Sequence, residues 1–190
     1  MEHKKLIEFL GIIEKLKCNT RHCWTCGGRQ ESVAEHCFRL SVMAMLCRDE
    51  YPHIDMLKLL KMCLIHDFGE ALTGDVPAFY KTKHHELEEN RAISKLLQTL
   101  PDNYREELSA LFCELKELKT DEAKLCKALD KMETLISHNE SPLDTWLELE
   151  YEKNLTYGAE NVEWSEWTKQ LKQQIKKDSL EKINSNKPRK

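Results

Sequence analysis

The sequence predicts an all-α fold, a single bundle of about six or seven helices, and three observations support this prediction. The chain has 190 residues, which suits one globular domain. It contains only 6 Gly and 5 Pro, too few for a sheet-rich chain with many tight turns. Apolar residues recur every three or four positions along most of the chain, which is typical of helices with one buried face.

Each expected helix is defined by such an apolar stripe. The first stripe, for example, is formed by Leu6, Leu10, Ile13 and Leu16. The expected helical segments are residues 3–17, 35–51, 56–66, 84–100, 102–119, 121–136 and 164–175, with a short helix at 143–153. The segment between the first two helices is rich in Cys, Gly and polar residues, so we expect a loop there and no strand.

Several residues indicate where these helices begin and end. Ser32 precedes Glu35 by three positions, which is the spacing of a capping box at a helix start. Pro52 and Pro101 end the helices before them, because proline lacks the N–H that the helix needs. The triplet at residues 73–75, Thr-Gly-Asp, has turn chemistry.

The composition is that of one folded domain with a polar end. Hydrophobic residues make up 41% of the chain and charged residues 33%, enough for one core and a well-solvated surface. The apolar periodicity stops near residue 176. We therefore expect a domain at residues 1–176 and a polar, disordered tail at residues 177–190.

The net charge and the distribution of apolar residues indicate which kinds of binding partner the sequence disfavours. The net charge of -4 argues against binding a nucleic-acid polymer or a membrane surface, although a locally basic site for a small anion remains compatible with it. The N-terminal segment is charged throughout and lacks a signal-peptide core, and no stretch is apolar enough to span a bilayer. We expect a cytoplasmic protein whose eight cysteines are reduced thiols.

Four His and Asp residues indicate a metal site. Adjacent His66 and Asp67 end an otherwise apolar helix, where ionisable groups are costly unless they are paired or bind a metal. His36 lies near the start of one helix, and Asp130 lies beside the buried stripe of another. Mixed imidazole and carboxylate ligands suit one divalent transition metal ion (Co, Mn, Fe, Ni or Zn) more than Ca. Taken alone, the His-Asp pair is explained equally well by chance.

Three stretches of the sequence carry a resemblance to a known family. They are RQESVAEH at residues 29–36, HDFGEALTGDVP at residues 66–77 and KALDKM at residues 127–132. Their order and spacing resemble the HD-domain metal-dependent phosphohydrolase superfamily, in particular its branch of YfbR-like 5'-deoxynucleotidases and HD-domain-containing protein 2 relatives. The resemblance spans most of residues 5–140 and implies a single HD-domain helical bundle.

The resemblance implies a role for each matching residue. The implied metal ligands are His36, His66, Asp67 and Asp130. Glu70 matches the catalytic glutamate of the family, and Asp75 matches an acidic residue near the attacking water and the substrate sugar. Arg21 matches an arginine that binds phosphate. The aromatic residue that follows this arginine in the family is replaced here by His22.

The residues themselves fit these roles but leave alternatives open. Glu70 follows His66 by four positions, so both can face one site, where Glu70 can exchange a proton with water or a leaving group. The alternative for Glu70 is a solvated acid at a helix end, and for Asp75 a purely local role in a turn. Arg21 and Arg29 can both clamp a phosphate. An ion pair with a neighbouring element explains Arg29 equally well.

A second motif offers a different chemistry. Cys23 and Cys26 form a CxxC, which can bind zinc or carry out redox reactions. A second CxxC that would complete a structural zinc site is absent from the sequence. Zinc could still be bound by Cys18, His22, Cys23 and Cys26 alone, but we expect this loop to line the active site, so coincidence is the preferred interpretation.

The sequence thus favours an enzyme. The lead hypothesis is metal-dependent hydrolysis of deoxynucleoside 5'-monophosphates to deoxynucleoside and phosphate, with a small-molecule nucleotide as the partner. One alternative within the superfamily is removal of triphosphate from deoxynucleoside triphosphates. An alternative from another class is a non-catalytic nucleotide-binding or scaffold protein. Trp164 and Trp167 on the last helix form an apolar face that docks on the body of the domain or on a second copy in a homodimer.

Overall fold

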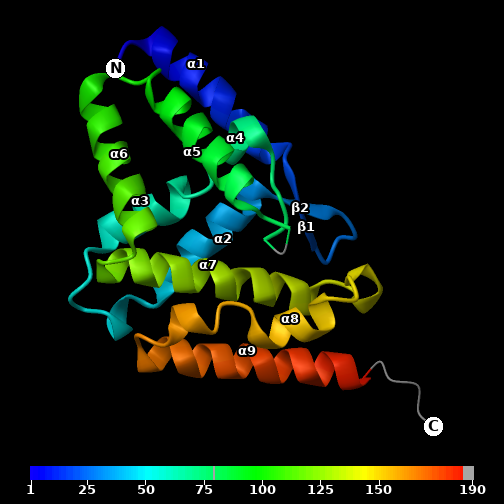
Figure 1. Ribbon diagram of the computed structural model, residues 1–190. Helices are drawn as coiled ribbons and strands as arrows, with labels where there is room; N and C mark the ends of the chain where they lie inside the picture. Colours follow the sequence, from blue (N-terminus) through cyan, green and yellow to red (C-terminus); the bar gives the residue numbers. More distant parts are fainter. Residues whose placement is uncertain (79, 186–190) are drawn as a thin grey trace.

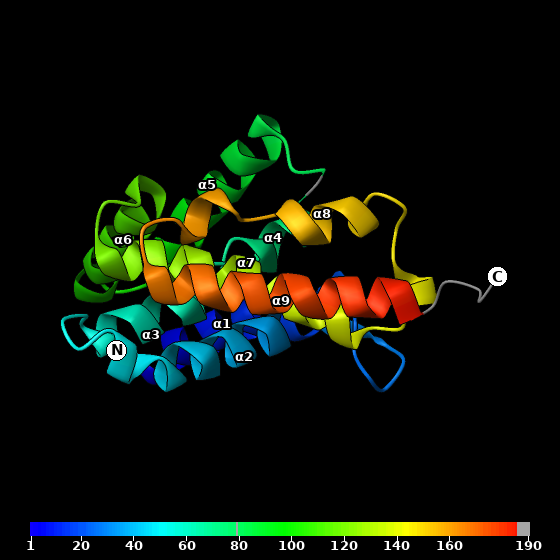
Figure 2. The ribbon, with the colours of Figure 1, turned by 90° about the horizontal axis from the view of Figure 1, so that it is seen from below.

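The computed structural model, which describes residues 1–78 and 80–185, confirms the all-α prediction (Figures 1 and 2). The α-helices of the described chain are α1 (His3–Ile13), α2 (Val33–Leu46), α3 (Met56–Ile65), α4 (Glu70–Thr73), α5 (Lys83–Leu97), α6 (Asp102–Glu117), α7 (Asp121–Glu140), α8 (Glu150–Thr156) and α9 (Glu166–Ser185). A small antiparallel sheet joins β1 (Thr20–Trp24) to β2 (Gln30–Ser32). The expected short helix at residues 143–153 is a 3-10 turn, Leu143–Thr145, followed by α8.

The central helix of the bundle is α7, which crosses the middle of the molecule in Figure 1. It contacts α2, α3 and α6 on one side and α9 on the other. Its predicted apolar stripe is confirmed, because Leu125, Leu129 and Met132 are fully buried and Ile136 packs against the same core. Since α7 is covered from two sides, polar residues on it are buried as well, and this is what places Asp130 inside the molecule.

The segment before α2 is a β-hairpin, so the prediction of a loop without strands there was wrong. Its strands are held to α7 by bonds that are distant in sequence. The N–H of Trp24 donates to Oγ of Ser141 at 3.2 Å, and this hydroxyl donates to the carbonyl of Trp24 at 2.7 Å. Cys23 is buried beneath the hairpin. These tertiary contacts do not produce a local apolar alternation, which explains why the sequence pattern did not indicate strands.

The start of α2 agrees with the predicted capping box. Oγ of Ser32 accepts a hydrogen bond from the backbone N–H of Glu35, and the carboxylate of Glu35 accepts one from the N–H of Ser32 at 2.8 Å. Such a reciprocal cap satisfies two backbone donors that the first helical turn would leave free. The cap fixes the direction in which α2 leaves the hairpin and brings His36, one turn into the helix, to the core.

Two glycines shape the turn that follows α3. A Cβ added to Gly69 would lie 2.7 Å from the Glu89 side chain and 3.1 Å from its carbonyl oxygen, so α4 packs on α5 at a distance that only glycine allows. Gly74 ends α4 with φ of +77°, a conformation that favours glycine. The short helix α4 between them contacts α5 and α1.

The last helix extends further than expected. We predicted a disordered tail from residue 177, but α9 continues through Ser185, and the remaining residues 186–190 lie outside the described residues. Ser179 is fully buried and donates through Oγ to Asn139 on α7 at 2.8 Å, a contact that the polar composition did not indicate. Trp164 and Trp167 pack against the main core, so this apolar face docks on the body of the domain.

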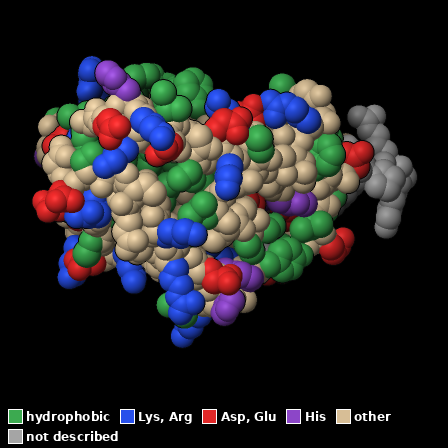
Figure 3. Space-filling view, turned by 90° about the horizontal axis from the view of Figure 1, so that it is seen from above, with side chains coloured by type: hydrophobic (Ala, Val, Ile, Leu, Met, Phe, Trp, Pro, Cys, Tyr) green, Lys and Arg blue, Asp and Glu red, His purple; other side chains and the backbone are tan. Residues whose placement is uncertain are grey.

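The surface carries mixed charge. On the face seen in Figure 3, Lys and Arg side chains are interspersed with Asp and Glu, as expected for a net charge of -4. Among the described residues, the helices all lack the combination of length and apolar character that a membrane span requires.

Candidate active site

The four predicted metal ligands lie close together, although they come from three different helices or their ends. His36 projects from α2, His66 and Asp67 follow α3, and Asp130 lies on α7. Nε2 of His36 lies 3.4 Å from Nε2 of His66, 3.9 Å from Oδ2 of Asp67 and 3.4 Å from Oδ1 of Asp130. Nε2 of His66 lies 3.1 Å from Oδ2 of Asp67. Two imidazole nitrogens and two carboxylate oxygens therefore converge.

The hydrogen bonds behind these ligands leave the correct atoms free for a metal. Nδ1 of His66 lies 2.9 Å from the carbonyl oxygen of Cys63, so Nδ1–H donates to this carbonyl and Nε2 faces the other donors, where it can bind a metal. Nδ1 of His36 likewise bonds to the carboxylate of Glu133. A metal-ligating His commonly donates its second N–H to a carboxylate or a backbone carbonyl. The donor set thus fits one divalent cation.

Glu133 is a functional residue that sequence reasoning missed. It is fully buried on α7, and besides His36 it accepts hydrogen bonds from Nε of Arg39 at 2.7 Å and from Oγ of Ser137 at 3.1 Å. Burial alone would raise the pKa of Glu133, but the bond to His36 and the charges of nearby arginines lower it. The available signal was its position, three residues after Asp130 on a helix that is buried on two sides.

Replacing Glu133 by glutamine should weaken metal binding about 10- to 100-fold, because the carboxylate that orients His36 and increases its basicity loses its charge. Competition with a chelating dye measures this affinity directly and does not depend on turnover. Glu117→Gln, an exposed change on α6, is the matched control and should bind metal as the wild type does. Equal affinity in the Glu133 variant would show that this carboxylate is only structural.

Glu70 and Asp75 lie near Asp67 on one side of the same cavity. Glu70 is only 4% exposed, and its Oε2 has no hydrogen-bond partner among the described residues. Burial, followed by repulsion from the carboxylates of Asp67 and Asp75, raises the pKa of Glu70 to about 9. Burial also raises the pKa of Asp75. A carboxyl group that keeps its proton at neutral pH can act as a proton donor.

Lysine side chains surround this acidic group. Nζ of Lys81 lies 2.5 Å from Oε2 of Glu89 and 4.0 Å from Oε1 of Glu70. Lys131 and Lys127 approach Oδ2 of Asp130 at 3.1 and 3.5 Å, on the oxygen that does not face the imidazoles. The two oxygens of Asp130 are thus divided between the lysines and the metal ligands.

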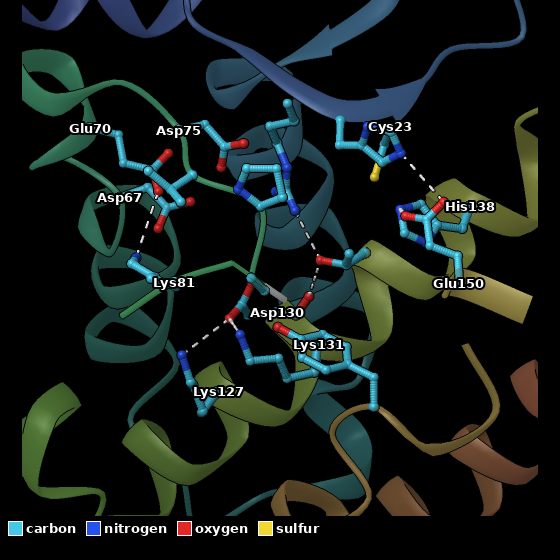
Figure 4. A pocket seen from close by; sticks show the side chains of 17 residues that line it. Cys23, Asp67, Glu70, Asp75, Lys81, Lys127, Asp130, Lys131, His138 and Glu150 are labelled. Carbon is cyan, nitrogen blue, oxygen red and sulfur yellow. Dashed lines mark hydrogen bonds and ion pairs between the residues drawn. The ribbon is translucent and has the colours of Figure 1, made fainter. Parts of the chain in front are cut away.

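One cavity of about 750 Å³, counting the part open to solvent, is lined by Asp67, Glu70, Asp75, Asp130 and the three lysines (Figure 4). Arg21 reaches the cavity from β1 and donates through Nη2 to Oγ1 of Thr134 at 2.9 Å. Its Nη1 is buried and has no hydrogen-bond partner among the described residues. A buried donor without a partner at a cavity wall is suited to bind an anion.

The other two features singled out in the sequence are Arg29 and the Cys23–Cys26 pair. Arg29 is 62% exposed on the hairpin and pairs with the Glu35 carboxylate, Nη1 lying 2.9 Å from Oε2. This is the structural ion pair that the sequence left open as the alternative to substrate binding. Cys23 lines the cavity as a buried free thiol, whereas Cys26 is exposed and free, so the two do not form a disulfide.

Comparison with known proteins identifies relatives along most of the chain. The HD domain family matches residues 13–172. The 5'-deoxynucleotidase HDDC2 of Dictyostelium discoideum is 36% identical over 141 residues, which cover 68% of this chain and 74% of the relative. The human 5'-deoxynucleotidase HDDC2 is 34% identical over 142 residues, covering 72% and 68%. The 5'-deoxynucleotidase hdd1 of Schizosaccharomyces pombe is 33% identical over 138 residues, covering 68% and 69%.

Solved structures share the fold. A predicted metal-dependent phosphohydrolase from Magnetospirillum magnetotacticum superposes with a TM-score of 0.77 at 25% identity, covering 95% of this chain and 92% of that one. A conserved hypothetical protein from Pyrococcus furiosus superposes with a TM-score of 0.67 at 30% identity, covering 92% and 99%.

Proposed function

This chain belongs to the HD domain family, and on that premise we propose that it is a metal-dependent phosphohydrolase that converts deoxynucleoside 5'-monophosphates to deoxynucleosides and phosphate. The similar proteins of Dictyostelium, human and fission yeast bear the name 5'-deoxynucleotidase. The observation that carries the proposal is the convergence of two imidazole nitrogens and two carboxylate oxygens at a cavity that also holds Glu70 and Arg21.

The proposed metal ligands are Nε2 of His36 and His66 and one carboxylate oxygen each of Asp67 and Asp130. The mixed nitrogen and oxygen set suits Mn, Fe, Co, Ni or Zn. When bound, such an ion supplies Lewis acidity to the phosphoryl group and to the water that attacks it.

The remaining groups of the cavity have separate tasks in this proposal. Arg21 binds the phosphate through its unpartnered Nη1, and the nearby lysines add positive charge. As water attacks phosphorus and the bond from phosphorus to the 5' oxygen breaks, the leaving oxygen needs a proton. Glu70, a buried carboxyl group on the wall of this cavity, is placed to donate it and to take up the proton that the attacking water releases. Asp75, on the same side of the cavity in Figure 4, positions the attacking water and the sugar.

An assay of purified protein, loaded in turn with each candidate metal, tests this function against the deoxynucleoside monophosphates and triphosphates. We expect release of inorganic phosphate from monophosphates, detected colorimetrically, with elemental analysis identifying the metal that the protein retains. Release of triphosphate instead would favour the alternative reaction. The absence of any product with every metal would rule out the proposed function.

Two further expectations stay predictions: a cytoplasmic location and a homodimer. The face formed by Trp164 and Trp167 is used within the chain, so a dimer needs a different surface.

A further inference from the structure

The cavity has a second polar end, which the phosphate chemistry leaves unused. Figure 4 shows Cys23, His138 and Glu150 grouped on the side of the cavity away from Asp67 and Glu70. We call this group, together with His22 on β1, the Glu150 end. It combines residues from the hairpin, from α7 and from α8, three elements that are far apart in the sequence.

Glu150 places one carboxylate oxygen without a hydrogen bond at this end. The residue is 1% exposed, and its Oε2 accepts a hydrogen bond from the backbone N–H of Leu147 at 2.7 Å. Nε2 of His22 lies 3.4 Å from the same Oε2. Oε1 accepts no hydrogen bond from the described residues, and Nε2 of His138 lies 3.3 Å from it. A buried carboxylate oxygen in this state is costly unless a ligand donates to it.

The imidazole of His138 places a second hydrogen-bond acceptor beside Oε1 of Glu150. Nδ1 of His138 lies 2.8 Å from Oδ1 of Asn154, so Nδ1 carries the proton and Nε2 has the free lone pair. Burial lowers the pKa of His138, which keeps the ring neutral. Oε1 of Glu150 and Nε2 of His138 are therefore two adjacent acceptors. One –NH₂ group has two hydrogens and can donate to both.

The charges of the cavity orient a nucleotide along it. The phosphate is dianionic, so it is drawn to Arg21 and the lysines and is repelled by the carboxylate of Glu150. The base then extends toward the Glu150 end. We propose that this end binds the exocyclic amino group of a nucleobase, so that the enzyme prefers cytosine and adenine nucleotides to the uracil, thymine and hypoxanthine ones. The inference rests on the proposed function, which places the phosphate at the other end.

The preference follows from the hydrogen bonds that each base can make. The amino group of cytosine or adenine donates to Glu150, whereas the oxo group of uracil or hypoxanthine would place a third acceptor beside two others. A polar site that leaves its buried groups unpaired rejects such an analogue strongly. Two matched pairs of deoxynucleotides test this difference. The deoxy forms of CMP and AMP carry the amino group, and the deoxy forms of UMP and IMP carry an oxo group in its place.

Isothermal titration calorimetry of the metal-free full chain with these four monophosphates tests the proposal. We expect each amino nucleotide to bind about tenfold more tightly than its oxo partner, or more. In Glu150→Gln the amide can donate as well as accept, so the ratio should fall toward one or invert, while the bond from the Leu147 N–H is retained. Glu152→Gln, an exposed neighbour on α8, should keep the wild-type ratio.

Three outcomes would each overturn the inference. They are equal affinities within each pair, binding of none of the four probes, and an unchanged affinity ratio in the folded Glu150 variant. A parallel assay of phosphate release distinguishes a failure of this inference from a failure of the proposed function. If both members of a pair bind equally and are hydrolysed, the function stands and the inference fails. If the amino preference is seen but no metal supports hydrolysis, the inference stands and the function fails.

Discussion

Replacing Asp67 by alanine should reduce phosphate release at least about a thousandfold, because the proposed metal site loses one of its four ligands. Oδ2 of Asp67 lies 3.1 Å from Nε2 of His66 and 3.9 Å from Nε2 of His36. Burial alone would raise the pKa of Asp67, but these two imidazoles outweigh it and lower the pKa, so the carboxylate is charged and ready to bind a cation.

The loss should come from the site and not from unfolding. Asp67 lies two residues after the end of α3, and the hydrogen bond that its backbone carbonyl accepts from the N–H of Glu70 does not depend on its side chain. The circular dichroism of Asp67→Ala should stay helical while its bound metal, measured by elemental analysis, falls. Asp49→Ala, which changes an 88% exposed carboxylate, is the matched control and should keep both metal and activity. Full activity in the Asp67 variant would mean that the metal site is elsewhere.

Elements with local signals were predictable from the sequence. The capping box of Ser32 and Glu35 marks the start of α2 within a few residues, because capping is an interaction between near neighbours. The stripe of Leu125, Leu129 and Met132 is equally local in its 3.6-residue period. The hairpin was missed because its strands are held by Ser141, more than a hundred residues away.

The residues of the site also differ in whether a local sequence signal could identify them. His66, Asp67 and Glu70 are close in sequence, and their spacing alone brings them to one turn. Glu133 and Glu150 could not be assigned from the sequence, because their roles come from burial against His36 and His138 after the chain has folded. From sequence alone, a glutamate on an expected helix is interpreted as an exposed, solvated residue, because charged side chains are rarely buried. Functional residues that act through tertiary burial therefore need the structure.

Replacing Glu70 by glutamine should lower kcat by about 10²- to 10⁴-fold, because the amide cannot give a proton to the leaving oxygen. Unlike Asp67→Ala, this variant should retain its metal, since Glu70 is outside the set of four converging donors. Steady-state kinetics with elemental analysis distinguishes the two variants. Glu106→Gln, an exposed change on α6, should behave as the wild type. Metal loss in Glu70→Gln would instead assign Glu70 to the ligand set.

The raised pKa of Glu70 also predicts how the stability of the metal-free protein depends on pH. In the folded chain this carboxyl keeps its proton up to about pH 9, whereas in the unfolded chain it loses it near 4.5. Between these values the folded state binds more protons, so the free energy of unfolding falls as pH rises. Urea unfolding at pH 6 and pH 9 should show a smaller fall for Glu70→Gln than for the wild type or Glu106→Gln. Equal falls in all three proteins would mean that Glu70 is ionised in the fold, and a different group would then have to protonate the leaving oxygen.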